Sequence, residues 1–253
     1  MMKGFPRPVT TLNTFTADLQ LVSPIRSHGY VFVPSRTSAR YLSGAQDAEF
    51  RAFAQSWQRL EIDPYLAQLG RLRRRRHGLF CASDLGEVET LAHGPHIQST
   101  DYNPLFGDVE RWFEPLQPQT MRNACLLKVI GFGGELFAAV DQQACRWNVE
   151  VHQFRIEARA DRTGQPTPEG RHRDGVDFVL VMMVARRNIR SGQTQLSDAR
   201  GEPLGSFTLA EPMDMVLLDD RRLWHAVTPV EPIQPQEPAF RDVLVVTYKR
   251  QSD

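Results

Sequence analysis

The chain carries a histidine and an aspartate two positions apart, and another histidine follows about fifty residues later. His172 and Asp174 lie in the segment 168–175 (PEGRHRDG), and His225 lies in the apolar run 223–227. Side chains at positions i and i+2 of a strand point to the same face, so His172 and Asp174 are expected to share one face. Two imidazoles and one carboxylate, with other positions left open, are the ligand set of non-haem Fe(II) oxygenases. The three residues therefore predict a one-sided metal site in an enzyme.

The His-x-Asp pair is weak evidence by itself. The chain has seven histidines, so one such pair can arise by accident as a loop histidine beside an acidic neighbour. Three features favour the metal interpretation. Pro166, Pro168 and Gly170 bring the chain tightly into the motif, and a strand-like run follows at 178–184. His225 lies in an apolar run, where an imidazole without a partner would be costly.

An arginine at the start of an apolar run adds a second kind of site. Arg241 precedes the run 243–248, which has the composition of a core strand. A guanidinium at the entrance of such a strand, facing a pocket, favours a carboxylate that it can bind through two hydrogen bonds. In an oxygenase that uses 2-oxoglutarate, this partner is the distal carboxylate of the cosubstrate.

The overall composition excludes several classes of function. The 253 residues include 30 basic and 30 acidic side chains, so the net charge of zero gives no field that would favour nucleic acid or a membrane. The first residues lack the apolar run of a signal peptide, and no segment has the length and apolarity of a membrane span. The scattered Cys81, Cys125 and Cys145 have no CxxC spacing and are interpreted as reduced thiols of a cytoplasmic protein.

The first half of the chain has helical patterns. Phe50, Phe53, Trp57 and Leu60 have helical spacing, which predicts an amphipathic helix over 45–61.

A second helix is expected around 120–130, ended by the glycines of 131–134 (GFGG). From residue 147 onward, short runs separated by Gly, Pro, Asp and Asn predict strands, and many short strands are typical of a sandwich or jelly roll. The expected strands are 148–159, 177–185, 193–197, 213–218, 223–228 and 242–248. No stretch has the composition of a linker between domains.

Four segments resemble a known family: 151–156 (VHQFRI), 166–175 (PTPEGRHRDG), 219–222 (DDRR) and 241–244 (RDVL). They resemble the Fe(II)/2-oxoglutarate-dependent dioxygenase superfamily, in particular the bacterial branch of isoleucine 4-hydroxylase and the biofilm stress and motility proteins. The resemblance covers roughly residues 70–250 and extends weakly through 73–76 and 98–107.

The resemblance implies a mainly β (α+β) fold, a double-stranded β-helix or jelly roll with supporting helices from the N-terminal half. Residues 1–253 would form one dioxygenase domain, with a helix-rich part at 1–140 and the β-helix core at 147–250. The resemblance also implies that His172, Asp174 and His225 bind Fe(II) and that Arg241 binds 2-oxoglutarate. The cosubstrates would be 2-oxoglutarate and O2, with ascorbate as the reductant in vitro. The implied reaction is hydroxylation of an aliphatic C–H of a small substrate, a free or N-modified amino acid.

The residues that contact the substrate are less well defined. Along the strand 148–159, Gln153 and Arg155 share one face, while His152 shares the other face with its apolar neighbours. Which face lines the interior is left open by the sequence. An inward Arg155 would anchor a substrate carboxylate, and the alternative is an ion pair at the rim. Trp224, next to His225, is a further candidate for packing around the metal and substrate.

Three charged motifs receive other interpretations. The run 73–76 (RRRR) is too short, in a chain of zero net charge, to predict nucleic-acid binding. It is expected to form a strand that presents two arginines to the mouth of the active site and two to solvent. The segment 219–222 is interpreted as a charged turn, and His93 and His96 as loop residues, because the intervening Gly-Pro forbids a helix.

Other functions remain open at this stage. A cupin-like metalloenzyme that does not use 2-oxoglutarate is one alternative, although the chain lacks the glycine-rich His-x-His motif and Arg241 would have no role. A non-catalytic or regulatory protein on the same fold is another, and an oxygenase that acts on a protein or tRNA side chain would need an open charged groove. The sequence leaves open the substrate, the hydroxylated carbon and the oligomeric state, for which a homodimer is one option.

Overall fold

The computed structural model describes residues 18–42, 47–71, 73–143 and 145–251. Its centre is an eight-stranded sheet in which all neighbouring strands are antiparallel, called the main sheet below. In spatial order it contains β1 (Tyr30–Val33), β10 (Met215–Asp219), β6 (Phe178–Arg187), β13 (Ala239–Arg250), β5 (Arg146–Ala158), β3 (Arg73–Ser83) and β2 (Glu61–Ile62), with β4 (Val88–Thr90) beside β3.

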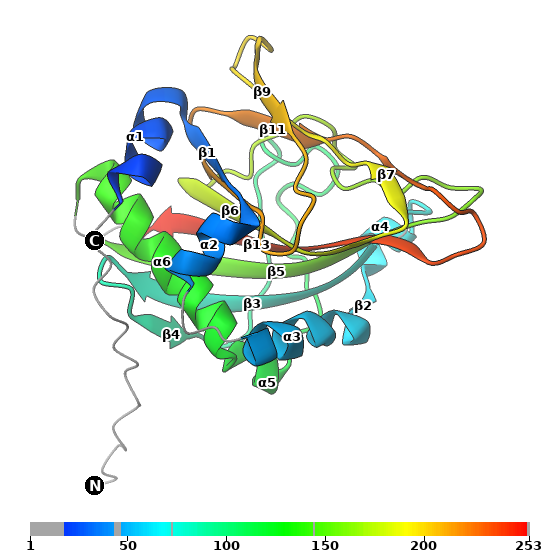
Figure 1. Ribbon diagram of the computed structural model, residues 1–253, viewed down its shortest axis with the longest axis horizontal. Coiled ribbons are helices and arrows are strands. Elements are labelled where there is room, and N and C mark those ends of the chain that lie inside the picture. The colour runs from blue at the N-terminus through cyan, green and yellow to red at the C-terminus, as the bar shows by residue number, and fades with distance from the viewer. Residues whose placement is uncertain (1–17, 43–46, 72, 144, 252–253) are drawn as a thin grey trace, which may run out of the picture.

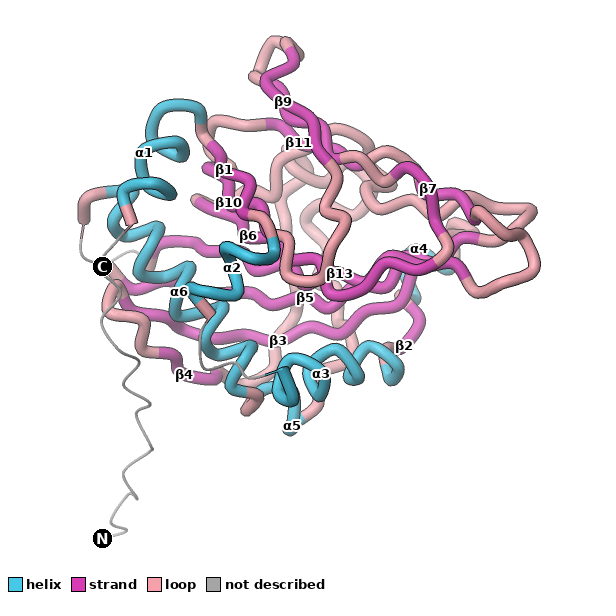
Figure 2. The backbone as a smooth tube through the Cα atoms, in the orientation of Figure 1, coloured by secondary structure: helices cyan, strands magenta, loops and turns pink. Residues whose placement is uncertain are grey.

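Two smaller sheets lie on one side of the main sheet (Figure 1). One contains β11 (Trp224–Val227), β8 (Thr194–Ser197) and β9 (Pro203–Phe207), and the other contains β12 (Val230–Pro232) and β7 (Ile189–Ser191). Figure 2 shows that loops make most of the connections between these sheets. The layered, antiparallel arrangement confirms the predicted double-stranded β-helix.

The helices come from the first 141 residues, and most of them cover the other side of the main sheet (Figure 1). They are α1 (Leu19–His28), α2 (Ser35–Tyr41), α3 (Asp47–Gln55), the 3-10 helix η1 (Ser56–Arg59), α4 (Pro64–Ala67), α5 (Pro118–Met121) and α6 (Ala124–Asp141). The predicted helix over 45–61 is present as α3 and η1, and its residues 45 and 46 lie outside the described part of the chain. No helix in the described ranges combines the length and the apolar character that a membrane crossing requires.

Helix α6 is longer than the sequence predicts. It begins after Asn123, whose side chain accepts hydrogen bonds from two backbone N–H groups of the first turn, and it runs through 131–134 to Asp141. The prediction that the glycines end the helix is wrong, because they serve close packing. A Cβ at Gly133 would collide with Tyr248, and one at Gly134 would lie 2.8 Å from the carbonyl oxygen of Ser83. The glycines therefore let the helix lie close against the main sheet.

Two apolar clusters hold these layers together. The larger one lies between the helices and the outer face of the main sheet and includes Trp57, Phe137 and Trp147. The smaller one lies between the main sheet and the smaller sheets and includes Leu196 and Val243. Because apolar burial is the main stabilising term of a fold, the outer cluster can anchor the sheet while the inner face carries polar residues.

Candidate active site

A cavity of about 440 Å³ lies between the inner face of the main sheet and the smaller sheets. This volume is typical of sites for small molecules. Every second residue of β13, from Arg241 to Lys249, lines the cavity, as the alternation of side chains along a strand requires. The residues predicted to bind metal and 2-oxoglutarate all line it: His172, Asp174, His225 and Arg241.

The structure shows which face of β5 is the inner one. His152 lines the cavity, whereas Gln153 and Arg155 belong to the opposite face and do not. Gln153 is fully buried and donates to the hydroxyl oxygen of Ser56 at 2.7 Å. Arg155 forms a two-pronged ion pair with Asp242, with both distances 2.7 Å. The structure thus does not bring Gln153 and Arg155 to the cavity, and Arg155 has the ion pair that was its alternative role.

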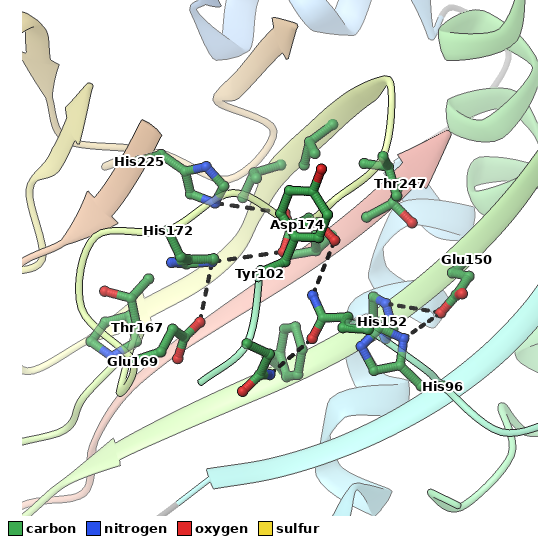
Figure 3. A pocket seen from close by; sticks show the side chains of 18 of the residues that line it. His96, Tyr102, Glu150, His152, Thr167, Glu169, His172, Asp174, His225 and Thr247 are labelled. Carbon is green, nitrogen blue, oxygen red and sulfur yellow. Dashed lines mark hydrogen bonds and ion pairs between the residues drawn. The ribbon is translucent and has the colours of Figure 1, made fainter. Parts of the chain in front are cut away.

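His172, Asp174 and His225 point toward one another (Figure 3). The carboxylate of Asp174 lies 3.7 Å from Nε2 of His172 and 3.6 Å from Nε2 of His225, and all three candidate ligand atoms lie within 4.8 Å of one another. The two histidines also exchange backbone hydrogen bonds of 3.0 and 2.9 Å, which fix their separation. His225 belongs to β11, as predicted. His172 and Asp174 precede β6 in a loop, so the expectation that they lie on a regular strand is wrong, although both side chains reach the same side.

The loop that carries Asp174 is held by a buried carboxylate. Asp220 accepts hydrogen bonds from the backbone N–H groups of Asp174, Gly175 and Val176, at 3.0, 2.8 and 3.2 Å. Gly175 has a positive φ of 81°, and a Cβ there would lie 2.5 Å from the ring of Tyr102. Sequence analysis missed this role, because it treated Asp220 as part of a charged turn. The missed signal is an acidic pair directly after an apolar run.

The hydrogen bonds of the two histidines fit a bound divalent metal. Nδ1 of His172 lies 3.0 Å from the carbonyl oxygen of Gly170, which can only accept, so Nδ1 carries a proton and Nε2 can present a lone pair. Nδ1 of His225 is buried without a hydrogen-bond partner among the described residues, and Oδ1 of Asp220 lies 3.9 Å away. If Nε2 of His225 bound a metal, the ring proton would be on Nδ1. That N–H would face the carboxylate of Asp220. Metal-bound histidines generally have such partners.

The charges around these residues favour a cation. Burial alone lowers the pKa of His172, but its hydrogen bond to Asp174 and the negative charges of Glu169 and Asp174 raise that pKa to about 9. Burial raises the pKa of Asp174, but the hydrogen bond from His172 and the charges of both histidines outweigh it and lower the pKa. Burial and the charge of His172 lower the pKa of His225 to about 4. The site therefore holds an ionised carboxylate that already attracts a proton to His172, where a metal ion would replace it.

Arg241 is a buried cation without a partner. It is 3% exposed, and its guanidinium makes no hydrogen bond or ion pair within the described residues. Burial, and then the charge of Arg186, lower its pKa to about 10, so it stays charged near neutral pH. A buried charge without a counterion is costly, which makes this end of the cavity a receptor for an anion.

Trp224 has a supporting position. Its ring lies between two guanidinium groups, with Cζ of Arg171 at 5.1 Å and Cζ of Arg173 at 5.4 Å from the ring centroid. Arg173 also lies over the ring of Tyr102 at 5.3 Å. Such cation–π contacts stabilise the segments on both sides of His225. Trp224 does not line the cavity, so the structure gives no support to a substrate contact by this side chain.

The arginine run forms a strand and divides between its two faces, as predicted, but Arg76 is not presented to solvent: its side chain is 11% exposed and donates to two backbone carbonyl oxygens. Arg73 and Arg75 line the cavity from β3, while Arg74 and Arg76 point to the other face. Arg74 pairs with Glu157 at 2.7 Å, outside the cavity.

A second group of polar residues was not predicted. His96, Glu150 and His152 lie at the end of the cavity away from Glu169 and Thr167 (Figure 3), and His77 belongs to the same group of possible ligands. His96 lies in a loop, as expected, but its side chain reaches the cavity. The signal in the sequence was Glu150 and His152 at i and i+2 on one strand. Their partners come from segments more than fifty residues earlier, so sequence spacing alone did not reveal the group.

Comparisons with known proteins agree with this geometry. A family model described as 2OG-Fe dioxygenase matches residues 54–247, well over half of the chain. A 3(1)-hydroxy-L-isoleucine 4-dioxygenase from Pantoea ananatis is 24% identical over 245 residues, which cover 93% of this chain and 97% of that protein. A crystal structure of a BsmA homologue from Methylobium petroleophilum is 37% identical, with a TM-score of 0.81 and coverage of 91% and 92% of the two chains. The crystal structure of IDO from Bacillus thuringiensis is similar in fold, with 18% identity, a TM-score of 0.77 and coverage of 92% and 99%.

The length of the family match settles the class of the enzyme, and the cavity supplies the residue types that this class requires. The chain belongs to the 2OG-Fe dioxygenase family, and it is accordingly a non-haem iron enzyme that uses Fe(II), 2-oxoglutarate and O2.

Proposed function

We propose that this enzyme hydroxylates an aliphatic C–H bond of a small substrate, a free or N-modified amino acid. One observation carries the proposal: a two-histidine, one-carboxylate cluster and an unpaired arginine line the same cavity. The size of that cavity suits a small molecule better than a polypeptide or RNA strand. The similarity to an enzyme named for a hydroxy-L-isoleucine substrate supports the choice of an amino acid.

We assign the three metal ligands to His172, Asp174 and His225, through Nε2 of each imidazole and the carboxylate of Asp174. This arrangement occupies one side of the metal and leaves the other positions for the cosubstrate and O2. When bound, Fe(II) and 2-oxoglutarate together supply the activation of O2 that C–H hydroxylation needs. Asp220 keeps the loop of Asp174 in place through its backbone hydrogen bonds.

We assign the distal carboxylate of 2-oxoglutarate to Arg241, which can bind it through two parallel hydrogen bonds. The cavity that Arg241 shares with the metal cluster is also lined by apolar side chains, which include Val179, Val181, Val216 and Val243. These side chains exclude water from the reacting atoms and hold the cosubstrate in one orientation. We further propose that the protein works in the cytoplasm, where its three free cysteines stay reduced.

The test is succinate release from 2-oxoglutarate with Fe(II) and ascorbate, across the aliphatic L-amino acids and their N-acetyl forms. We expect one compound to stimulate succinate release and to gain one oxygen atom, as measured by mass spectrometry. Iron-dependent binding of 2-oxoglutarate without stimulation by any compound would instead favour a macromolecular substrate or a sensor. Absence of 2-oxoglutarate binding would contradict the proposal and favour a cupin-like metalloenzyme.

A further inference from the structure

The unpredicted polar group is built around one carboxylate oxygen. Oε2 of Glu150 lies 2.6 Å from Nδ1 of His96 and 3.7 Å from Nε2 of His152 (Figure 3), and 3.0 Å from Nε2 of His77. Three imidazoles thus converge on a single acceptor atom. This arrangement is either a second metal site or a carboxylate that accepts hydrogen bonds from His77 and His96, with His152 facing the same oxygen.

The hydrogen bond from Arg75 distinguishes the two. Nη2 of Arg75 lies 2.8 Å from Nδ1 of His152, and a guanidinium can only donate. Nδ1 of His152 therefore holds a lone pair, and its proton is on Nε2, on the side of Glu150. His152 has no free lone pair there for a metal.

The surrounding histidines keep the Glu150 carboxylate ionised, and one of its two oxygens remains accessible to a ligand. Burial lowers the pKa of His77, to about 4, and also the pKa values of His96 and His152, so all three are neutral near pH 7. Burial opposes ionisation of Glu150, but the hydrogen bonds from His77 and His96 lower its pKa well below the usual range. All of these contacts reach Oε2. Oε1 has no hydrogen-bond partner among the described residues, and the side chain is 29% exposed where it lines the cavity.

Positive charge lies at the same end of the cavity. Arg111 lines the cavity, is buried and donates to Oε1 of Gln98 at 2.7 Å, with no carboxylate within 4.0 Å among the described residues. Its Nε has no hydrogen-bond partner among the described residues. Within the same part of the chain, the only carboxylate within 4.0 Å of Arg75 is that of Asp63, at 3.9 Å, and Arg73 already binds it at 2.9 and 2.7 Å. These two guanidiniums therefore have little compensating charge from the protein.

We propose that this end of the cavity binds a zwitterion: Glu150 receives the primary ammonium group of the substrate, and Arg75 and Arg111 receive its carboxylate. The inference rests on the proposed function and narrows it to substrates with a free α-amino group. One imidazole ring, that of His152, separates Arg75 from Glu150. Arg75 lies 2.8 Å from Nδ1 of this ring and Glu150 faces its Nε2 at 3.7 Å, so an ammonium and a carboxylate on one carbon would lie on either side of the ring. An N-acyl amino acid would bring a neutral, larger amide to Glu150, which would leave the buried carboxylate without a counterion.

The test is calorimetry of the enzyme with Fe(II) and 2-oxoglutarate under anaerobic conditions, so that binding is read without turnover. The probes are the aliphatic L-amino acids, followed by the N-acetyl and des-amino forms of the tightest binder. Glu150→Gln keeps the size and an acceptor for the histidines but removes the charge. Glu157→Gln, a change on the same strand at a carboxylate outside the cavity, is the matched control.

We expect Glu150→Gln to weaken binding of the amino acid at least about tenfold, which is typical of a lost charge-assisted hydrogen bond. The affinities for Fe(II) and 2-oxoglutarate should not change, and Glu157→Gln should behave like the wild type. The N-acetyl and des-amino probes should bind more weakly than the free amino acid, and Glu150→Gln should not weaken them further.

Four outcomes would overturn the inference. The first is equal binding of the amino acid by the wild type and Glu150→Gln. The second is an N-acetyl probe that binds as well as the free amino acid. The third is a second equivalent of Fe(II) or Zn²⁺ that disappears in Glu150→Gln, which would assign the group to a metal. The fourth is binding of Fe(II) and 2-oxoglutarate without binding of any amino acid. Failure of Fe(II) and 2-oxoglutarate to bind would instead contradict the proposed function itself.

Discussion

At the scale of single residues, the proposed chemistry depends on two buried charges. Asp174 helps to raise the pKa of His172, and Arg241 is buried without an anion among the described residues. Proteins rarely retain buried charges in this state unless a ligand completes them. Each of these two residues therefore leads to a separate prediction.

Asp174→Ala should abolish iron binding and 2-oxoglutarate turnover while leaving the fold intact, because the side chain lines the cavity and belongs to neither apolar cluster. Iron content after dialysis and circular dichroism measure the two effects. Asp161→Ala, at an exposed turn, is the control. An Asp174→Ala protein that retains a full equivalent of iron would show that the metal lies elsewhere.

Arg241→Ala should raise the 2-oxoglutarate concentration needed for half-maximal turnover at least about tenfold, because the carboxylate loses a charge-assisted pair of hydrogen bonds. Iron affinity should be unchanged. Steady-state kinetics against 2-oxoglutarate measure the effect, with Arg190→Ala, a change on the exposed edge of β7, as the control. An unchanged requirement would place the cosubstrate anchor on another residue.

At the scale of elements, the loop before β6 depends on Asp220. Asp220→Ala removes the acceptor of three backbone N–H groups, so the loop of Asp174 should loosen. We expect iron affinity to fall about 10- to 100-fold, as for other residues that orient metal ligands. Asp220→Asn retains one acceptor oxygen and should recover part of this loss.

Titration of iron into the wild type, Asp220→Ala and Asp220→Asn checks this prediction. The change should appear in the affinity for iron, with a much smaller change in the affinity of the iron-loaded enzyme for 2-oxoglutarate. If Asp220→Asn lost as much iron affinity and as much thermal stability as Asp220→Ala, Asp220 would serve only the stability of the fold.

The same elements show what the sequence could and could not predict. The three residues proposed to bind metal were predicted to lie together because two of them are two positions apart and the third lies in a strongly apolar strand, and the structure brings them together. The polar group of Glu150 was missed because its members come from β3, β5 and a loop, which only the sheet register brings together. The inner face of β5 could not be chosen from alternation alone, since both faces are largely buried. Gly133 was read as a helix end because sequence does not reveal that Tyr248 packs there.

At the scale of the whole molecule, we propose that the chain forms one domain. Helices α1, α3 and α6 share their apolar cluster with the main sheet, so neither part can bury its surface alone. Thermal unfolding should therefore follow one transition, with the same midpoint by far-ultraviolet circular dichroism and by tryptophan fluorescence. Two separate midpoints would show that the helix-rich part and the β-helix core unfold independently, and would contradict a single domain.

The most direct test of the whole account is anaerobic titration of the protein with Fe(II) and then with 2-oxoglutarate, followed by visible absorption and calorimetry. We predict one iron per chain, and a charge-transfer band that appears only when metal and cosubstrate are both present. Asp174→Ala should lose both signals, and Arg241→Ala should lose only tight cosubstrate binding. Binding of 2-oxoglutarate that does not require iron, or a chain that binds no iron at this site, would contradict the account.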